Sequence, residues 1–115
     1  MAVTIYHNPR CSKSRQALQL LRDRGIEPEI VEYLKTPPTA DELDAVLAKL
    51  GLEPRAAMRA KEAAYREAGM DDEGLSRRAL IDLMAAHPVV IERPIVVNGA
   101  RAALGRPPES VLSIL

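Results

Sequence analysis

The chain has few of the residues from which covalent or metal cross-links are built. Its 115 residues contain one cysteine and two histidines, so no disulfide can form within the chain. These three side chains are widely spaced and make no ligand set for zinc, so no bound metal is expected. A single unpaired thiol fits a reducing compartment, where thiols stay reduced.

The chain also lacks net charge and long apolar stretches. Its 16 basic and 16 acidic side chains balance, whereas broad binding to nucleic acid or to a membrane surface relies on summed positive charge. No apolar run reaches the roughly 18 residues that a membrane helix needs, and the beginning MAVTIYHN does not read as a signal peptide. We therefore expect a monomeric cytoplasmic protein without nucleic-acid or membrane partners.

The residues that are present suit one globular domain. Apolar residues make up 47% of the chain and charged residues 28%, which is ordinary for a folded protein and argues against disorder. A chain of this length buries roughly two-thirds of the surface that its unfolded form exposes. We predict a single domain over residues 1–115.

Strand and helix patterns alternate in the first part of the chain. The β-rich run AVTIY ends at the turn signal Asn8-Pro9 and predicts a strand. Apolar residues then recur at helical spacing up to Gly25, a natural helix stop. The run EIVEYL, residues 29–34, predicts a second strand, parallel to the first because a helix joins the two.

Helical signals fill the middle of the chain. The run TPPTADELDAVLAKLG predicts a helix with Thr39 as its N-cap and Glu42 completing a capping box. Short helices are expected over residues 54–74, and Ser76 should cap a further helix that ends at the sequence HPVV. We place a helical insertion at about residues 39–87.

The end of the chain returns to strands. PIVV, the pair Asn98-Gly99 and ARAAL together predict a β-hairpin, and Pro107-Pro108 opens a last short helix. Parallel strands first, an antiparallel hairpin last and helices between them are the layout of an α/β protein with a thioredoxin-like fold. We predict a mixed four-stranded sheet with an inserted helical block.

Cys11 is predicted at or beside the N-cap of the first helix. A thiolate there faces exposed backbone N–H groups and the positive end of the helix dipole, which lower the pKa of a cysteine from about 8.5 to roughly 3.5–7.5. Cations of the same loop should act in the same direction, namely Arg10, Lys13, Arg15 and a protonated His7. Because the thiolate is the nucleophilic form, we predict that Cys11 is reactive.

The spacing CSKS is that of a C-x-x-C redox pair whose second sulfur is replaced by Ser14. Ser14 lies one helical turn on and can donate a hydrogen bond to the thiolate, but it cannot form a disulfide. Any adduct on Cys11 must therefore be resolved by a thiol from another molecule. A phosphatase-type anion loop, which needs an arginine six residues after the cysteine, is excluded because that position is Ala17.

Three arginines are candidates for holding an anion. Arg59 follows the apolar run AAM, Arg93 precedes Pro94, and Arg106 lies in GRPPES before the last helix. A guanidinium presents a planar fork of donors suited to oxyanions. On composition alone, a surface charge is the better explanation for each of the three, because arginine is frequent in this chain.

Five blocks of the sequence resemble the glutaredoxin-coupled class of arsenate reductases. They are YHNPRCSKSR, YLKTPPTADEL, MRAKEAAY, ERPIVV and GRPPESV, in the family's order and at similar spacing over nearly the whole chain. The resemblance implies a thioredoxin-like fold with a helical insertion and a cis-proline at Pro94. It also implies roles for six residues: Cys11 as the catalytic thiol, His7 and Ser14 in lowering the pKa of that thiol, and Arg59, Arg93 and Arg106 around the oxyanion.

The mechanism that this resemblance implies needs external reductants and no bound cofactor. Arsenate docks on the arginines, the Cys11 thiolate attacks arsenic, and glutathione attacks the adduct. Glutaredoxin then takes up the mixed disulfide as arsenite leaves. Glutathione and glutaredoxin are therefore the expected partners.

Other functions of the same fold stay open at this stage. A transcription regulator resembling the Spx group would bind RNA polymerase, but such proteins commonly carry a true C-x-x-C switch. A monothiol glutaredoxin-like protein would act on glutathione adducts or carry an iron–sulfur cluster, but it usually shows a CGFS-like site, and CSKS lacks the glycine and phenylalanine. A third alternative is a paralogue that keeps the site but acts on another oxyanion or thiol adduct.

Overall fold

The computed structural model describes residues 2–115, and these divide into two units. The first unit joins the two ends of the chain, up to Thr36 and from Arg93 onward, and the second runs from Pro37 to Glu92. The helical insertion predicted for residues 39–87 falls inside the second unit. No helix within residues 2–115 combines the length and the apolar character that crossing a membrane would require.

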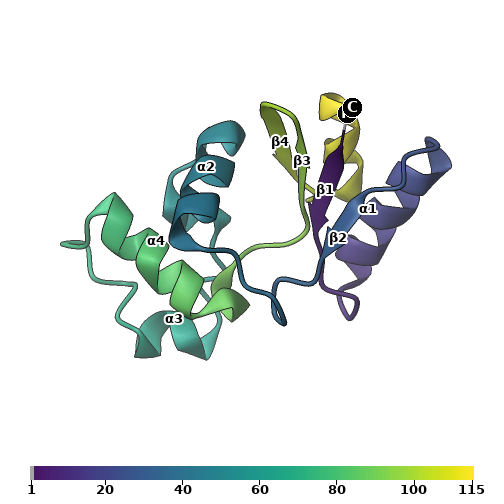
Figure 1. Ribbon diagram of the computed structural model, residues 1–115. Helices are drawn as coiled ribbons and strands as arrows, with labels where there is room; N and C mark the ends of the chain where they lie inside the picture. Colours follow the sequence, from purple (N-terminus) through teal and green to yellow (C-terminus); the bar gives the residue numbers. More distant parts are fainter. Residues whose placement is uncertain (1) are drawn as a thin grey trace. The chain divides into compact units, whose positions relative to one another are not determined.

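The first unit is built on a mixed sheet of four strands in the order β2-β1-β3-β4 (Figure 1). The strands are β1 Val3–Tyr6, β2 Glu29–Val31, β3 Ile95–Asn98 and β4 Arg101–Leu104. β1 pairs parallel with β2 and antiparallel with β3, and β3 pairs antiparallel with β4, so the prediction of a mixed four-stranded sheet is confirmed. The carboxyl ends of β1 and β2 therefore meet at one edge of the sheet.

The second strand is shorter than the sequence predicts. It ends at Val31, because the N–H groups of Lys35 and Thr36 turn back to the carbonyl of Glu32 at 2.9 and 3.0 Å. Tyr33, part of the predicted strand, is only 1% exposed. The prediction was too long because the residues of EIVEYL after Val31 favour a strand but have no strand partner.

The hairpin turn is displaced by one residue from its predicted place. Asn98 is still part of β3 and pairs with Arg101, so the turn consists of Gly99 and Ala100. Gly99 has a φ of 62°, and the first central position of a type II′ turn favours glycine for this reason.

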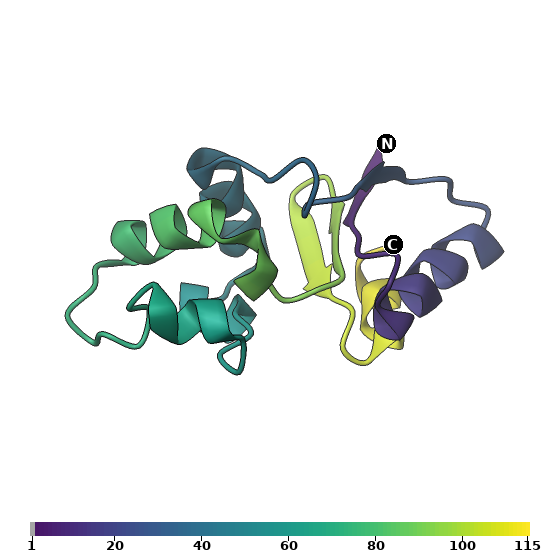
Figure 2. The same ribbon diagram turned by 90° about the horizontal axis from the view of Figure 1, so that it is seen from below.

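Helix α1, Ser12–Asp23, and the 3-10 helix η3, Pro108–Ile114, pack against each other beside the sheet (Figure 2). Their apolar side chains form one core with the inward residues of β1 and β3: Val3, Ile5, Ala17, Leu18, Leu21, Val96, Val111 and Ile114. Burial of a large apolar side chain contributes roughly 1.5–3 kcal/mol. This core therefore holds α1 against β1 and β3.

The second unit is helical, as predicted. It contains α2 Ala40–Leu50, η1 Pro54–Ala57, α3 Ala63–Glu67, α4 Arg77–Ala86 and η2 Pro88–Val90. The capping box at Thr39 is confirmed: its hydroxyl accepts from the N–H of Glu42 at 3.1 Å, and the Glu42 carboxylate accepts from the N–H of Thr39 at 3.0 Å. The Ser76 hydroxyl caps α4 by accepting from the N–H of Ala79.

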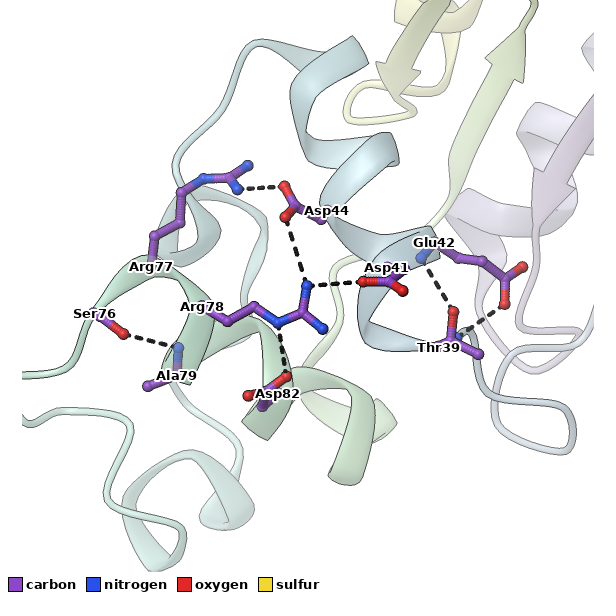
Figure 3. Close-up of polar contacts among 9 residues, drawn as sticks. All are labelled: Thr39, Asp41, Glu42, Asp44, Ser76, Arg77, Arg78, Ala79 and Asp82. Carbon is purple, nitrogen blue, oxygen red and sulfur yellow. Dashed lines mark hydrogen bonds and ion pairs between the residues drawn. The ribbon is translucent and has the colours of Figure 1, made fainter.

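Ion pairs join α2 to α4 on their exposed sides (Figure 3). The Arg78 guanidinium is 2.9 Å from Asp41 of α2, and Arg77 pairs with Asp44 of α2. Arg78 also pairs with Asp82 of its own helix at 3.2 Å. Such exposed pairs contribute little singly, at most about 1 kcal/mol each. The apolar contact between the two helices rests on the buried residues Leu43, Val46, Leu47, Leu80, Ile81 and Met84.

Candidate active site around Cys11

Cys11 is the N-cap residue of α1, as its position in the sequence predicts. Its backbone is extended, with φ −92° and ψ 122°, and the helix begins at the next residue. The residue is 9% exposed, so the thiol lies at the edge of the core. The positive end of the helix dipole and the first backbone N–H groups of α1 are thus directed at the sulfur.

The pKa of the Cys11 thiol is lowered even though the side chain is nearly buried. Burial is the largest single effect, and it raises the pKa because a thiolate loses its water. The backbone N–H of Ser14, the positive charge of Arg93 and the backbone N–H of Lys13 together outweigh it. The thiol forms no side-chain capping hydrogen bond of ordinary geometry, so these N–H groups act as nearby dipoles. The net effect is a lower pKa, which increases the fraction of thiolate.

Two arginines from the far end of the sequence surround the sulfur. The Nη2 atom of Arg106 is 4.0 Å from the Cys11 Sγ, and the Nε of the same guanidinium donates to the carbonyl of Arg93 at 3.0 Å. Arg93 itself donates a hydrogen bond to the thiolate, and its Nε and Nη1 atoms are shielded from solvent. Two fixed guanidinium groups beside one thiolate form a site suited to an anion.

Gly105 brings the Arg106 segment close to Pro94, and sequence reasoning missed it. The N–H of Gly105 donates to the carbonyl of Pro94 at 2.9 Å, and a Cβ added at Gly105 would lie 2.5 Å from the Pro94 Cγ. Only glycine permits this approach. The Arg93–Pro94 peptide bond is cis, as the resemblance implies, and so is the bond between Arg106 and Pro107. The glycine that begins GRPP was the available signal.

The Ser14 hydroxyl points toward His7 and Asn8. It lies 2.6 Å from the Nδ1 of His7 and accepts the N–H of Asn8 at 3.1 Å. Ser14 is 0% exposed and His7 is 5% exposed. The hydroxyl therefore braces the loop before Cys11, and Ser14 acts on the thiolate through its backbone N–H.

His7 does not supply the positive charge that the sequence suggested. Burial is the main cause that lowers its pKa below the ordinary value of 6.5, although Glu32 acts in the opposite direction. The imidazole is therefore neutral at neutral pH, and its contribution to the site is the contact with the Ser14 hydroxyl.

The loop cations also act differently from the prediction. Arg10, Lys13 and Arg15 are exposed, where water and salt screen their charges. The cation with the largest effect on the Cys11 pKa is Arg93. Among the predicted three, Lys13 acts through its backbone N–H, and Arg15 braces the loop by donating to the carbonyl of Pro9 at 2.8 Å.

Arg59 belongs to the second unit, whereas the other five predicted site residues belong to the first. Its N–H donates to the carbonyl of Val90 at 2.6 Å, which fixes the backbone. The guanidinium forms an ion pair with Glu62, and its Nε lies 4.0 Å from a carboxylate oxygen of Glu92. Arg59 is thus positioned by two carboxylates within its own unit.

The first unit therefore brings together a stabilised thiolate, two guanidinium groups and a buried His–Ser pair. Such a thiolate can attack an electrophilic centre in an anion that the arginines hold. Within residues 2–115, no three His, Cys, Asp or Glu side chains gather in a group suited to a metal ion. The chemistry that this site supports is nucleophilic attack by the Cys11 sulfur.

Known proteins resemble this chain over its whole length. Residues 6–114 match the ArsC family. The arsenate reductase of Neisseria meningitidis is 49% identical over 114 residues, which cover 98% of this chain and 97% of that protein. An arsenate reductase of Escherichia coli is 46% identical over 98% of this chain and 80% of its own length.

A solved structure agrees with both the sequence and the fold. The arsenate reductase from Vibrio cholerae is 53% identical and superposes with a TM-score of 0.96, covering 100% of this chain and 98% of that one.

Proposed function

Because this chain belongs to the ArsC family of thioredoxin-like proteins, we propose that it is an arsenate reductase, an enzyme that reduces arsenate to arsenite. The observation that carries the proposal is the Cys11 thiolate at the start of α1 with Arg93 and Arg106 beside it. Arsenate is a tetrahedral oxyanion, and paired guanidinium groups match its oxygens in shape and charge.

The first step is nucleophilic attack. Arg93 and Arg106 hold arsenate, and the Cys11 thiolate attacks arsenic. A sulfur–arsenic bond forms and an arsenic–oxygen bond breaks, and the departing oxygen takes up a proton and leaves as water. The same arginines offset the negative charge that gathers on the oxygens during the attack.

The reduction itself needs thiols from outside the chain, because Ser14 stands where a second cysteine would resolve the adduct. In a second step a glutathione thiol displaces another oxygen from arsenic, which leaves as water. A glutaredoxin thiolate then attacks the glutathionyl sulfur: a disulfide bond forms, the arsenic–sulfur bond to glutathione breaks with its electron pair staying on arsenic, and As(V) becomes As(III). Water finally replaces the Cys11 sulfur on arsenic, so that arsenite leaves and the Cys11 thiolate is restored. Glutathione and glutaredoxin are thus the proposed reductants.

Arg59 is the third proposed oxyanion ligand, on the strength of the MRAKEAAY block and the family membership. We place the enzyme in the cytoplasm as a monomer, since glutathione keeps a lone thiol reduced there.

A coupled assay tests this function. Arsenate, glutathione, glutaredoxin and glutathione reductase are combined, and NADPH consumption is followed. We expect turnover that vanishes in Cys11→Ser and falls by orders of magnitude in Arg93→Ala, while Arg24→Ala, which changes an exposed arginine at the other end of α1, keeps the parent rate.

Equal NADPH consumption with and without arsenate would contradict the proposal and favour a glutaredoxin-like activity. Copurification with RNA polymerase in the absence of arsenate turnover would favour the regulator.

A further inference from the structure

A groove of about 480 Å³ lies beside the active-site loop. One wall is formed by residues 7–10, which follow β1, and the other by residues of the segment 32–35, which follows β2. The two walls lie side by side because β1 and β2 are parallel, and the N–H of His7 donates to the carbonyl of Val31 at 2.8 Å. The volume is within the range of small-molecule sites, roughly 300–1,000 Å³.

The groove adjoins the nucleophile. The N–H of Cys11 donates to the carbonyl of Asn8, a wall residue, at 3.0 Å, and the N–H of Arg10 donates to the side chain of the same Asn8 at 3.0 Å. One turn therefore carries both the sulfur and the wall of the groove. A molecule seated here lies against the loop that leads directly into Cys11.

The groove carries two cations and one carboxylate. Arg10 is exposed, and its guanidinium forms no ion pair with any residue from 2 to 115. The Lys35 side chain is 77% exposed, and its Nζ is 3.6 Å from a carboxylate oxygen of Glu32. Leu34, 45% exposed, adds an apolar patch. Since Arg93 is the cation with the largest effect on the thiolate, the charge of Arg10 remains to be explained.

We propose that this groove binds the donor thiol, a small peptide thiol of the glutathione class, with Arg10 and Lys35 holding its carboxylates and Glu32 its ammonium. Such a molecule has two carboxylates and one ammonium, which is the complement of the groove's charges. The inference rests on the proposed function, because it is the adduct on Cys11 that requires an external thiol. A neutral thiol would gain nothing from these three charges.

The charge-reversal variant Arg10→Glu tests the assignment, with Arg24→Glu as a control of equal charge change at an exposed site on the far end of α1. Lys35→Glu serves as a second test variant on the opposite wall. We expect each test variant to raise the KM for glutathione about two- to five-fold, the size of an exposed ion pair. The KM for arsenate and the rate with 2-mercaptoethanol as the donor should stay at the parent values.

Binding without chemistry gives an independent readout. S-methylglutathione, which has no free thiol, should shift the backbone amide signals of residues 7–10 and 32–35 in the Cys11→Ser protein. The shifts should weaken in that protein when Arg10→Glu is added and persist when Arg24→Glu is added.

Three results would overturn the inference. The glutathione KM could change equally in Arg10→Glu and Arg24→Glu, or the test variants could lose as much rate with 2-mercaptoethanol as with glutathione. A change confined to the KM for glutaredoxin would instead make the groove a protein-docking surface. Failure of the proposed function looks different. Arsenate would then not protect Cys11 from iodoacetamide, a measurement that requires no glutathione.

Discussion

Replacing Ser14 with alanine separates the role of its hydroxyl from that of its backbone. The hydroxyl accepts the N–H of Asn8 at 3.1 Å and contacts the Nδ1 of His7 at 2.6 Å. Without it, both groups lose a partner: the imidazole in a place that water hardly reaches, since His7 is 5% exposed, and the Asn8 N–H at a half-buried position. A buried polar group left without a partner costs about 1–3 kcal/mol.

The free energy of unfolding should therefore fall by about 1–4 kcal/mol: about 1–3 kcal/mol for the imidazole and about 0.5–1.5 kcal/mol for the half-buried N–H, less about 0.5 kcal/mol that alanine returns through its higher helix propensity. Urea denaturation measures this loss. Ser12→Ala is the matched control, since Ser12 lies in the first turn of the same helix and is exposed. We expect the control to stay within about 0.5 kcal/mol of the parent.

The same variant should leave the pKa of Cys11 close to its parent value, because the backbone N–H of residue 14 is the group that stabilises the thiolate. The rate of iodoacetamide alkylation against pH reports that pKa. A clear rise of the midpoint in Ser14→Ala would mean that the hydroxyl itself donates to the sulfur. Equal stability of the Ser14→Ala and Ser12→Ala proteins would refute the bracing role.

Four further predictions follow from the same structure. Arg93→Gln should raise the pKa of Cys11, seen as a higher midpoint of alkylation against pH, because its charge and hydrogen bond favour the thiolate. The pKa of His7 lies below its ordinary 6.5 in the folded chain. The contribution of neutral His7 to the free energy of unfolding should therefore be complete above about pH 6.5 and be lost as the pH falls through the pKa of His7 in the folded chain. His7→Gln should flatten this dependence in urea titrations. Thr39→Ala should cost about 1 kcal/mol in urea denaturation, through loss of the cap on α2. On the proposal that Arg59 is the third oxyanion ligand, Glu62→Gln should lower the KM for arsenate by freeing the guanidinium, and an unchanged KM would contradict that role.

Local signals predicted the elements well wherever the structure depends on neighbouring residues. The caps at Thr39 and Ser76 are confirmed, because a cap is a contact between residues three apart. The start of α1 at Cys11 is confirmed too, although the thiol forms no capping hydrogen bond. The predictions were wrong where strand pairing decides the end of an element. The end of β2 at Val31 and the turn at Gly99 depend on which residues find strand partners.

The features of the site also separate into local and tertiary ones. The sequence alone determined that this protein has a lone cysteine at a helix start, followed by a serine that cannot form a disulfide. Only the tertiary structure decided which cations act on the sulfur, because Arg106 is 95 positions away from Cys11 along the chain while the adjacent loop cations point into water. Burial likewise decided the charge of His7, since desolvation depends on what packs around a side chain and no residue spacing reveals it.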